Sequence, residues 1–319
     1  MDEAKFGQWL GKPGRGIIAR LESWDERVDR YGARFWACDF IAPEGGCDGR
    51  MWPDDASTST PERLQAGGWY FVVPASGQWG TQSLNRLTAI IPIAEAFACL
   101  DSSPGDPSAD DPNWKRARRW FDRIPFPVIQ AFVMLVFMDE SLRQGFFRVP
   151  ASRQHHHSWE GGLAEHALEV AEHVEGHPLI RDPLQRCLGS VAGLLHDVGK
   201  VRTLSLNPST RRHSETLGHD RLTLEVLAGP LAWLDRVDPD VAHMLRYLLV
   251  WDPNQEPRPL IPTAIAVREA DRVSSAVSAF GITFAKAPGW ARFATLAASG
   301  PPNRFWRPDP REQGHLIGS

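Results

Sequence analysis

Histidines are concentrated in one short stretch of this chain, and a second motif further along carries another histidine. Six of the eleven histidines lie between positions 155 and 177, in HHHSWEGGLAEHALEVAEHVEGH. Further along, LLHDVGKV places His196 beside Asp197 at the end of an apolar run. An adjacent imidazole and carboxylate offer nitrogen and oxygen ligands, a set that suits Mn, Fe, Zn, Ni or Mg. The residues therefore indicate a divalent metal site.

Other side chains near these motifs could act on a phosphate. Lys200, in the same HDVGK string, could place a cation near one. His156 and His157 precede the predicted helix and are candidates to contact phosphate or metal. A His-Asp pair alone is more often a helix end with a satisfied histidine and a capping aspartate, so the interpretation depends on the whole set.

The N-terminal part reads as β-rich. Short runs of β-branched and aromatic residues, separated by Gly, Pro, Asp and Asn, predict strands at 16–23, 34–42, 47–53, 69–76 and 84–93. Between the third and fourth runs, residues 57–68 have a Ser/Thr cap, an early Pro and a Gly stop, which predicts a short helix. Three strands, a helix and two strands is the order of a five-stranded Greek-key barrel, the OB-fold.

A Pro-, Asp- and Ser-rich stretch then gives way to helical patterns. The predicted fold class is two-domain α+β, an OB-like barrel followed by an all-α domain. The expected boundaries are 1–99 for the barrel, 100–114 for a linker, 115–280 for the helical domain and 281–319 for a C-terminal extension to which no structure is assigned.

Composition limits the class of protein. A length of 319 residues favours two domains, and a net charge of −4 argues against a global electrostatic grip on nucleic acid. The four cysteines form no C-x-x-C pair, and the N-terminus has no apolar core of a signal peptide. We therefore expect a cytoplasmic protein without a membrane partner.

The strings GGLAEHALEVA, LLHDVGKV and READRVSSA together resemble the HD superfamily of metal-dependent phosphohydrolases. The resemblance covers roughly residues 115–280. It implies that the first metal is bound by His166, His196, Asp197 and Asp271. His219 and Asp252 are the candidates for a second metal, so one or two ions per chain are expected.

Two families within the superfamily share the glycine-entered helix. HHSWEGGLAEH resembles the signature of OB–HD 3′-to-5′ exoribonucleases, whereas VPASRQHHHSWEGGLAEHALEVA is similar to the HD-type relaxase domain of conjugative elements. The exoribonucleases carry a His-His pair where this chain has Trp251 and Asp252. Asp252 could replace an imidazole as ligand, or the second metal is lost.

The expected substrate is single-stranded nucleic acid, RNA or DNA. Trp36 and Trp52 could stack bases on the barrel, although strand alternation places some aromatics in its core. Lys115 and Arg116 begin a basic run that could contact the strand but is also typical of a solvated helix face. The leading hypothesis is a metal-dependent phosphodiesterase with 3′-to-5′ exonuclease-like action. The alternatives are a relaxase-like DNA-processing protein and a non-catalytic nucleic-acid-binding accessory.

Overall fold

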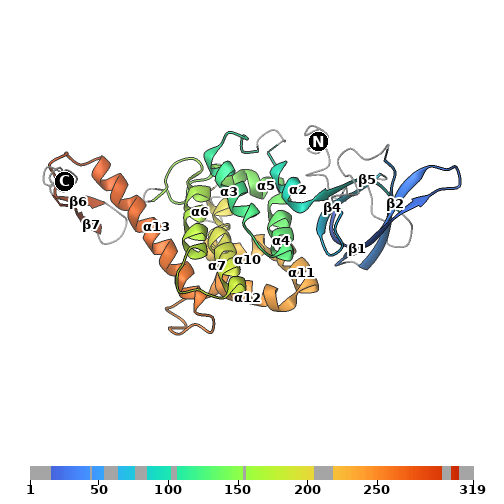
Figure 1. Ribbon diagram of the computed structural model, residues 1–319. Coiled ribbons are helices and arrows are strands. Elements are labelled where there is room, and N and C mark those ends of the chain that lie inside the picture. Colours follow the sequence, from blue (N-terminus) through green and yellow to red (C-terminus); the bar gives the residue numbers. More distant parts are fainter. Residues whose placement is uncertain are drawn as a thin grey trace, which may run out of the picture. The chain divides into compact units, whose positions relative to one another are not determined.

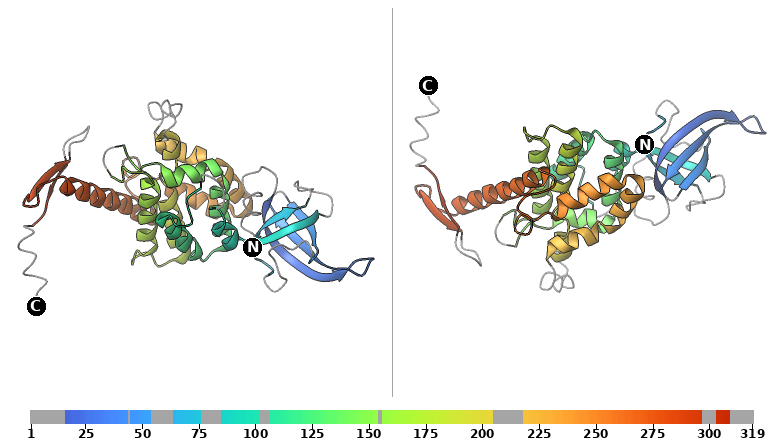
Figure 2. Two further views of the ribbon diagram at one scale, coloured as in Figure 1. Left: turned by 90° about the horizontal axis from the view of Figure 1, so that it is seen from above. Right: turned by 90° about the horizontal axis from the view of Figure 1, so that it is seen from below.

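The computed structural model, shown in Figures 1 and 2, describes most of the chain. The described residues are 16–43, 45–53, 64–75, 85–101, 106–153, 156–204, 218–296 and 303–308.

Five strands near the N-terminus form a closed barrel, blue to cyan in Figure 1. They are β1 (Ile17–Val28), β2 (Arg34–Ala42), β3 (Gly45–Met51), β4 (Trp69–Pro74) and β5 (Asn85–Pro92). The order around the barrel is β1-β2-β3-β5-β4, and β4 closes onto β1. Among the pairs that these described strands form, β3–β5 is parallel and the others are antiparallel. This Greek-key order confirms the predicted OB-like barrel.

Alternation along the strands produces the barrel core. In β2, Trp36, Cys38 and Phe40 are buried, whereas Asp39 and Ile41 between and beyond them are exposed. Successive side chains of a strand point to opposite faces, so every second residue enters the interior. Of the predicted helix at 57–68, residues 57–63 lie outside the described part, and a turn occupies the remainder.

Helices make up most of the rest of the described chain. They are α2 (Ile93–Ala98), α3 (Pro112–Asp122), α4 (Pro127–Met138), α5 (Glu140–Arg148), α6 (Gly162–Glu175), α7 (Pro183–Leu195), α8 (Lys200–Thr203), α10 (His219–Val226), α11 (Ala228–Val237), α12 (Pro239–Val250) and α13 (Thr263–Ala285). A barrel followed by helices confirms the predicted fold class. No helix within the described ranges is both long and apolar enough to cross a membrane.

The chain divides into two compact units. The first comprises Met1–Gln144 and Leu227–Arg246, and the second comprises Gly145–Val226 and Tyr247–Ser319. The predicted domain boundaries divide the chain differently and stay predictions. In the first unit, α2 and α4 contact the barrel strand β4, and α11 packs on α4. In the second unit, α6, α7 and α13 pack against one another.

The C-terminal extension, which the sequence left unassigned, is partly regular. Helix α13 continues to Ala285, and a hairpin of β6 (Phe293–Leu296) and β7 (Asn303–Trp306) follows it. Strand β6 contacts α13, so the hairpin belongs to the same unit as that helix.

A buried ion pair anchors the expected linker within the first unit. The side chains of Arg143 and Asp106 are 2% and 1% exposed. Arg143 donates from Nε and Nη2 to the two carboxylate oxygens of Asp106, each at 2.9 Å, and from Nη1 to the carbonyl of Phe137 at 2.7 Å. This two-pronged geometry satisfies both charges where water is excluded.

We predict that Asp106→Ala lowers the free energy of unfolding by about 3–5 kcal/mol, because it leaves the Arg143 guanidinium buried without its counter-ion. Asp110→Ala is the matched control, since Asp110 pairs with Lys115 at the surface, and it should leave stability nearly unchanged. Thermal and urea denaturation measure both. Equal stability of the two variants would contradict the anchoring role.

Candidate metal centre

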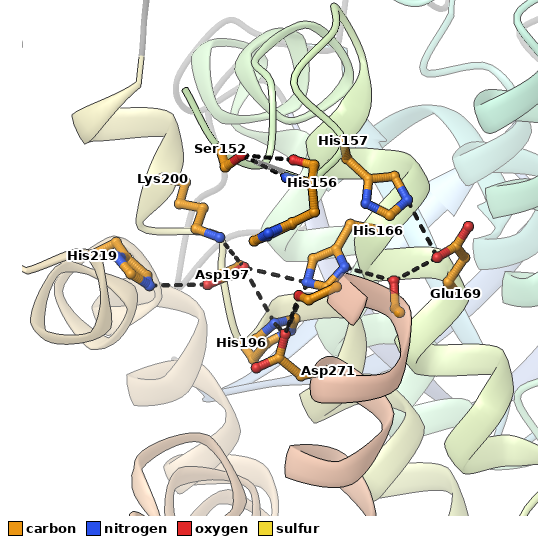
Figure 3. A network of polar contacts seen from close by, with 12 residues as sticks. Ser152, His156, His157, His166, Glu169, His196, Asp197, Lys200, His219 and Asp271 are labelled. Carbon is orange, nitrogen blue, oxygen red and sulfur yellow. Dashed lines mark hydrogen bonds and ion pairs between the residues drawn. The ribbon is translucent and has the colours of Figure 1, made fainter. Parts of the chain in front are cut away.

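Three helices of the second unit bring the predicted first-metal ligands together. His166 lies on α6, His196 and Asp197 follow the end of α7, and Asp271 lies on α13. Figure 3 shows these four side chains turned toward one another. They are separated by up to 105 positions in sequence, and the packing of α6, α7 and α13 is what makes them neighbours.

Two glycines at the start of α6 allow the histidine loop to lie against the helix. Gly161 has φ 77°, a left-handed conformation that favours glycine. A Cβ on Gly162 would lie 2.0 Å from the carbonyl oxygen of His157, so only glycine allows this approach. His157 itself has φ 44°. The close approach brings the rings of His156 and His157 to 5.3 and 5.4 Å from that of His166.

The ligand atoms of the cluster are close to one another. His166 Nε2 lies 3.2 Å from Asp271 Oδ1 and 3.6 Å from Asp197 Oδ2. His196 Nε2 lies 3.3 Å from Asp197 Oδ2 and 3.8 Å from Asp271 Oδ1. One ion placed among these atoms could therefore reach all four side chains.

The histidine hydrogen bonds leave the correct nitrogens for a metal. His166 Nδ1 is bonded to Ser274 Oγ at 2.9 Å, and His196 Nδ1 to the carbonyl of Gly193 at 2.7 Å. The Gly193 carbonyl can only accept, so His196 carries a proton on Nδ1 and turns Nε2 toward the cluster. The Nε2 atoms of both histidines are buried without a hydrogen-bond partner. Buried polar atoms are rarely left so, and the donor set fits a divalent cation.

Electrostatics also favour a cation here. Burial by itself would raise the pKa of Asp197, but His196 and Lys200 together hold it well below its ordinary value. Burial likewise opposes charging of His196, yet the carboxylates of Asp197 and Asp271 outweigh it and raise that pKa. Burial lowers the pKa of His166. The cluster thus holds two carboxylates whose charge is balanced by a proton or by a metal ion.

A second layer of residues, which the sequence interpretation missed, orients His166. Ser274 Oγ donates to Glu169 Oε2 at 2.5 Å and therefore accepts the His166 Nδ1 proton. His157 Nε2 lies 3.3 Å from the same Glu169 oxygen. Glu169 follows His166 by three residues on α6, and Ser274 follows Asp271 by three on α13. Helical spacing, which places such residues on one face, was the available signal.

Two further side chains predicted to act on substrate border the cluster. Lys200 is 8% exposed, and its Nζ lies 2.5 Å from Asp197 Oδ2. The Nε2 atom of His156 is buried without a hydrogen-bond partner. Burial, assisted by the Lys200 ammonium, lowers the pKa of His156 to about 4. His156 is therefore neutral at pH 7.

The two candidates for a second metal are placed differently. His219 Nε2 lies 3.3 Å from Asp197 Oδ1 and 3.2 Å from Asp220 Oδ1, and these three residues could hold an ion. Asp252 belongs to none of the potential ligand groups found among the described residues. Its carboxylate accepts bonds from Asn254 and Gln255, as in a turn after a helix. Asp220, rather than Asp252, is thus the carboxylate beside His219.

The residues predicted to contact nucleic acid differ in their exposure to solvent. Trp36 is 7% exposed and packs in the barrel core, so neither face of its ring is open to a base. Trp52 is half-buried and stacks on Phe35 with ring centroids 5.2 Å apart. On α3, Lys115 is exposed and paired with Asp110, and Arg116 is half-buried.

One known protein family matches the segment that contains the cluster. Residues 163–276 match the family model of the HD domain. No curated protein and no solved structure shows a significant match to the chain. His166, His196, Asp197 and Asp271 all lie inside the matched segment.

We predict that Ser274→Ala weakens metal binding by about tenfold to a hundredfold, because removing a hydrogen-bond partner of a ligand loosens its orientation. The variant separates His166 from Glu169 without touching a ligand atom. Val277→Ala is the control, a truncation to the same residue at a position of α13 that is 66% exposed. Titration calorimetry with Mn²⁺ compares them, and equal affinities would exclude the orienting role.

We also predict that metal binding releases about one proton near pH 7. The pKa of His196 is raised in the metal-free cluster, so the imidazole is protonated there and must lose that proton to become a ligand. The metal-free form binds the extra proton, so affinity should increase by about tenfold per pH unit as pH rises. Calorimetry in buffers of different ionisation enthalpy measures the release, and a proton count of zero would contradict it.

Proposed function

Residues 163–276 are an HD domain, of the superfamily of metal-dependent phosphohydrolases, and on that premise we propose that this protein hydrolyses phosphodiester bonds in single-stranded nucleic acid. In the proposal, His166, His196, Asp197 and Asp271 hold the divalent metal. Release of nucleotides proceeds in the 3′-to-5′ direction, as in the exoribonucleases that the glycine-entered helix resembles.

One observation carries the hydrolase assignment. The buried Nε2 atoms of His166 and His196 have no hydrogen-bond partner and face the carboxylates of Asp197 and Asp271. Leaving two such atoms unsatisfied costs free energy, since each loses its water without gaining a bond. Without a cation, only a proton on His196 offsets this cost, whereas a bound metal would engage both Nε2 atoms and both carboxylates at once.

The chain's own residues would divide the work between holding the ion and handling charge. A divalent cation at this position supplies Lewis acidity, which acidifies water and withdraws charge from phosphoryl oxygens. Lys200 keeps Asp197 anionic and places an ammonium beside the cluster to stabilise charge that develops on the phosphate. Neutral His156 offers its unpaired Nε2 to a water. His157, held by Glu169, keeps the loop in place.

A pocket of about 880 Å³ adjoins the cluster and supports a phosphate-bearing substrate. Asp271, whose side chain is 30% exposed, is one of its lining residues. Arg221, Arg268 and Arg272 also line it, together with Asp220 and Asp252. Guanidinium groups bind phosphate through paired hydrogen bonds, so this arginine pocket suits phosphates next to the scissile one. Its volume is in the range of a nucleotide-sized ligand rather than a single phosphate.

The barrel supports a single-stranded substrate. Half-buried Trp52 stacks on Phe35, which is only 5% exposed. The Arg50 Cζ lies 5.1 Å from the Phe35 ring and the Arg86 Cζ 5.0 Å from the Trp52 ring. Aromatic rings with neighbouring arginines are the surface on which OB-folds bind successive bases. The proposal therefore assigns Trp52, and not the buried Trp36, to base stacking.

We predict that Asp271→Asn abolishes both metal binding and hydrolysis, because it removes an anionic ligand while keeping the side-chain volume. Glu269→Gln is the control, an exposed carboxylate two residues away on α13, and it should retain both properties. Metal analysis and a cleavage panel of labelled single- and double-stranded RNA and DNA provide the readouts.

Wild-type hydrolysis by Asp271→Asn would refute the metal-hydrolase proposal. Stepwise release of nucleotides from 3′ ends supports the exonuclease-like form. A single internal cut in DNA would instead favour the relaxase-like alternative, and binding without any cleavage would favour the accessory one.

A further inference from the structure

The C-terminal part of the chain is basic and aromatic although the whole protein is acidic. From Arg272 to Pro308 there is no Asp or Glu, in a chain whose net charge is −4. The same stretch carries five basic residues and six aromatic ones, listed as Arg272, Lys286, Arg292, Arg304 and Arg307, and Phe280, Phe284, Trp290, Phe293, Phe305 and Trp306. Such a composition suits a polyanion that also has flat, apolar surfaces.

The hairpin that ends this stretch has one covered and one open face. Phe305 is half-buried and lies 5.8 Å from the ring of Phe280 on α13. Arg307 donates to the carbonyls of Ala291 and Gly289 and lies 4.4 Å from the ring of Phe284. These contacts attach the hairpin to the end of α13, where both appear in the orange and red part of Figure 2.

The open face presents its aromatic rings to solvent. Phe293 and Trp306 are paired across the hairpin and are 52% and 55% exposed. Arg304, on the same face by strand alternation, lies with its Cζ 4.5 Å from the Phe293 ring. Trp290, just before the hairpin, is 74% exposed. Grouped exposure of large apolar side chains marks a binding surface more often than chance scatter does.

A hollow lies beside this face. It has a volume of about 650 Å³, and Lys286, Trp290, Arg292 and Phe293 are among its lining residues. None of the described residues that line it carries a carboxylate. Two rings and two cations around a hollow of this size match the needs of a nucleotide, whose base stacks and whose phosphate is anionic.

We propose that this C-terminal surface, comprising Lys286, Trp290, Arg292, Phe293, Arg304 and Trp306, binds single-stranded nucleic acid. The inference rests on the proposed function and extends it. The metal cluster residue Asp271 and the end of the same helix at Ala285 are about 21 Å apart at 1.5 Å per residue. The surface therefore contacts a part of the strand several nucleotides from the bond that is cut, and it favours long substrates over short ones.

The charge of this surface favours nucleic acid over a protein as its ligand. An apolar interface with another protein would need aromatic residues, but it would not require that carboxylates be absent. An interface with a second copy of this acidic chain would need charges of both signs. The 37 residues from 272 to 308, which include this surface, instead carry basic and aromatic side chains and no carboxylate. Phosphates and bases satisfy both features together.

The test measures binding of a labelled single-stranded oligonucleotide to the full chain by fluorescence anisotropy. In Phe293→Ala combined with Trp306→Ala, affinity should fall by about tenfold or more, since each stacked base contributes about 1–3 kcal/mol. Leu179→Ala removes a side chain that is 80% exposed elsewhere in the same unit, and it should leave affinity unchanged. Thermal denaturation verifies that both variants are folded.

A second pair of substitutions tests the contribution of the arginine charges rather than that of the aromatic rings. Arg292→Gln with Arg304→Gln should lower the slope of log affinity against log salt by about 1.4, which corresponds to two phosphate contacts on a single strand. An unchanged affinity and an unchanged slope would overturn the inference. Variants that keep oligonucleotide affinity but lose binding to anionic phospholipid vesicles, or lose self-association, would overturn it in favour of a membrane or subunit surface.

The outcome is separable from that of the proposed function, because binding is read without turnover. A chain that binds through this surface but cleaves nothing would refute the hydrolase proposal and leave this inference standing. If the chain cleaves oligonucleotides and both double variants bind them normally, the proposed function stands and this inference fails.

Discussion

Two buried imidazole nitrogens that face two carboxylates set the main constraint on this protein. The Nε2 atoms of His166 and His196 lack hydrogen-bond partners, and Asp197 and Asp271 lie within 4 Å of them. In a medium of low dielectric constant, like charges of this kind need a counter-charge at close range. A divalent cation in the cluster would engage both nitrogens and both carboxylates at once, in place of the proton that His196 holds in its absence.

Much of the surrounding structure serves to keep that arrangement. Gly162 allows the carbonyl of His157 to approach the start of α6. This approach keeps the rings of His156 and His157 beside that of His166. Ser274 and Glu169 hold the ring of His166 from the side away from the carboxylates. Because these groups are fixed by bonds among themselves, the ligands are oriented before any ion binds, and less free energy is lost in ordering them.

The cluster is accessible on the side of Asp271, which also lines the arginine pocket. The pocket brings three arginines and three aspartates together, and Asp271 belongs both to it and to the cluster. The aromatic residues of the barrel and of the C-terminal hairpin belong to different compact units. Each places arginine side chains beside aromatic rings, with Trp52 half-buried on the barrel and Phe293 and Trp306 exposed on the hairpin.

Local patterns predicted most of the strands and helices, and the motifs that resemble the HD superfamily supplied the candidate ligands of the first metal. Strand alternation in β2, the glycines before α6 and the His196-Asp197 pair after α7 act over a few residues, so their consequences can be read from neighbours in the chain. The pairing of Ser274 with Glu169 spans 105 residues, and only the packing of α13 on α6 decides it. Packing likewise turned Trp36 inward and buried Asp106 against Arg143. Side-chain direction at such positions depends on which distant surface is nearest, and no local spacing encodes that.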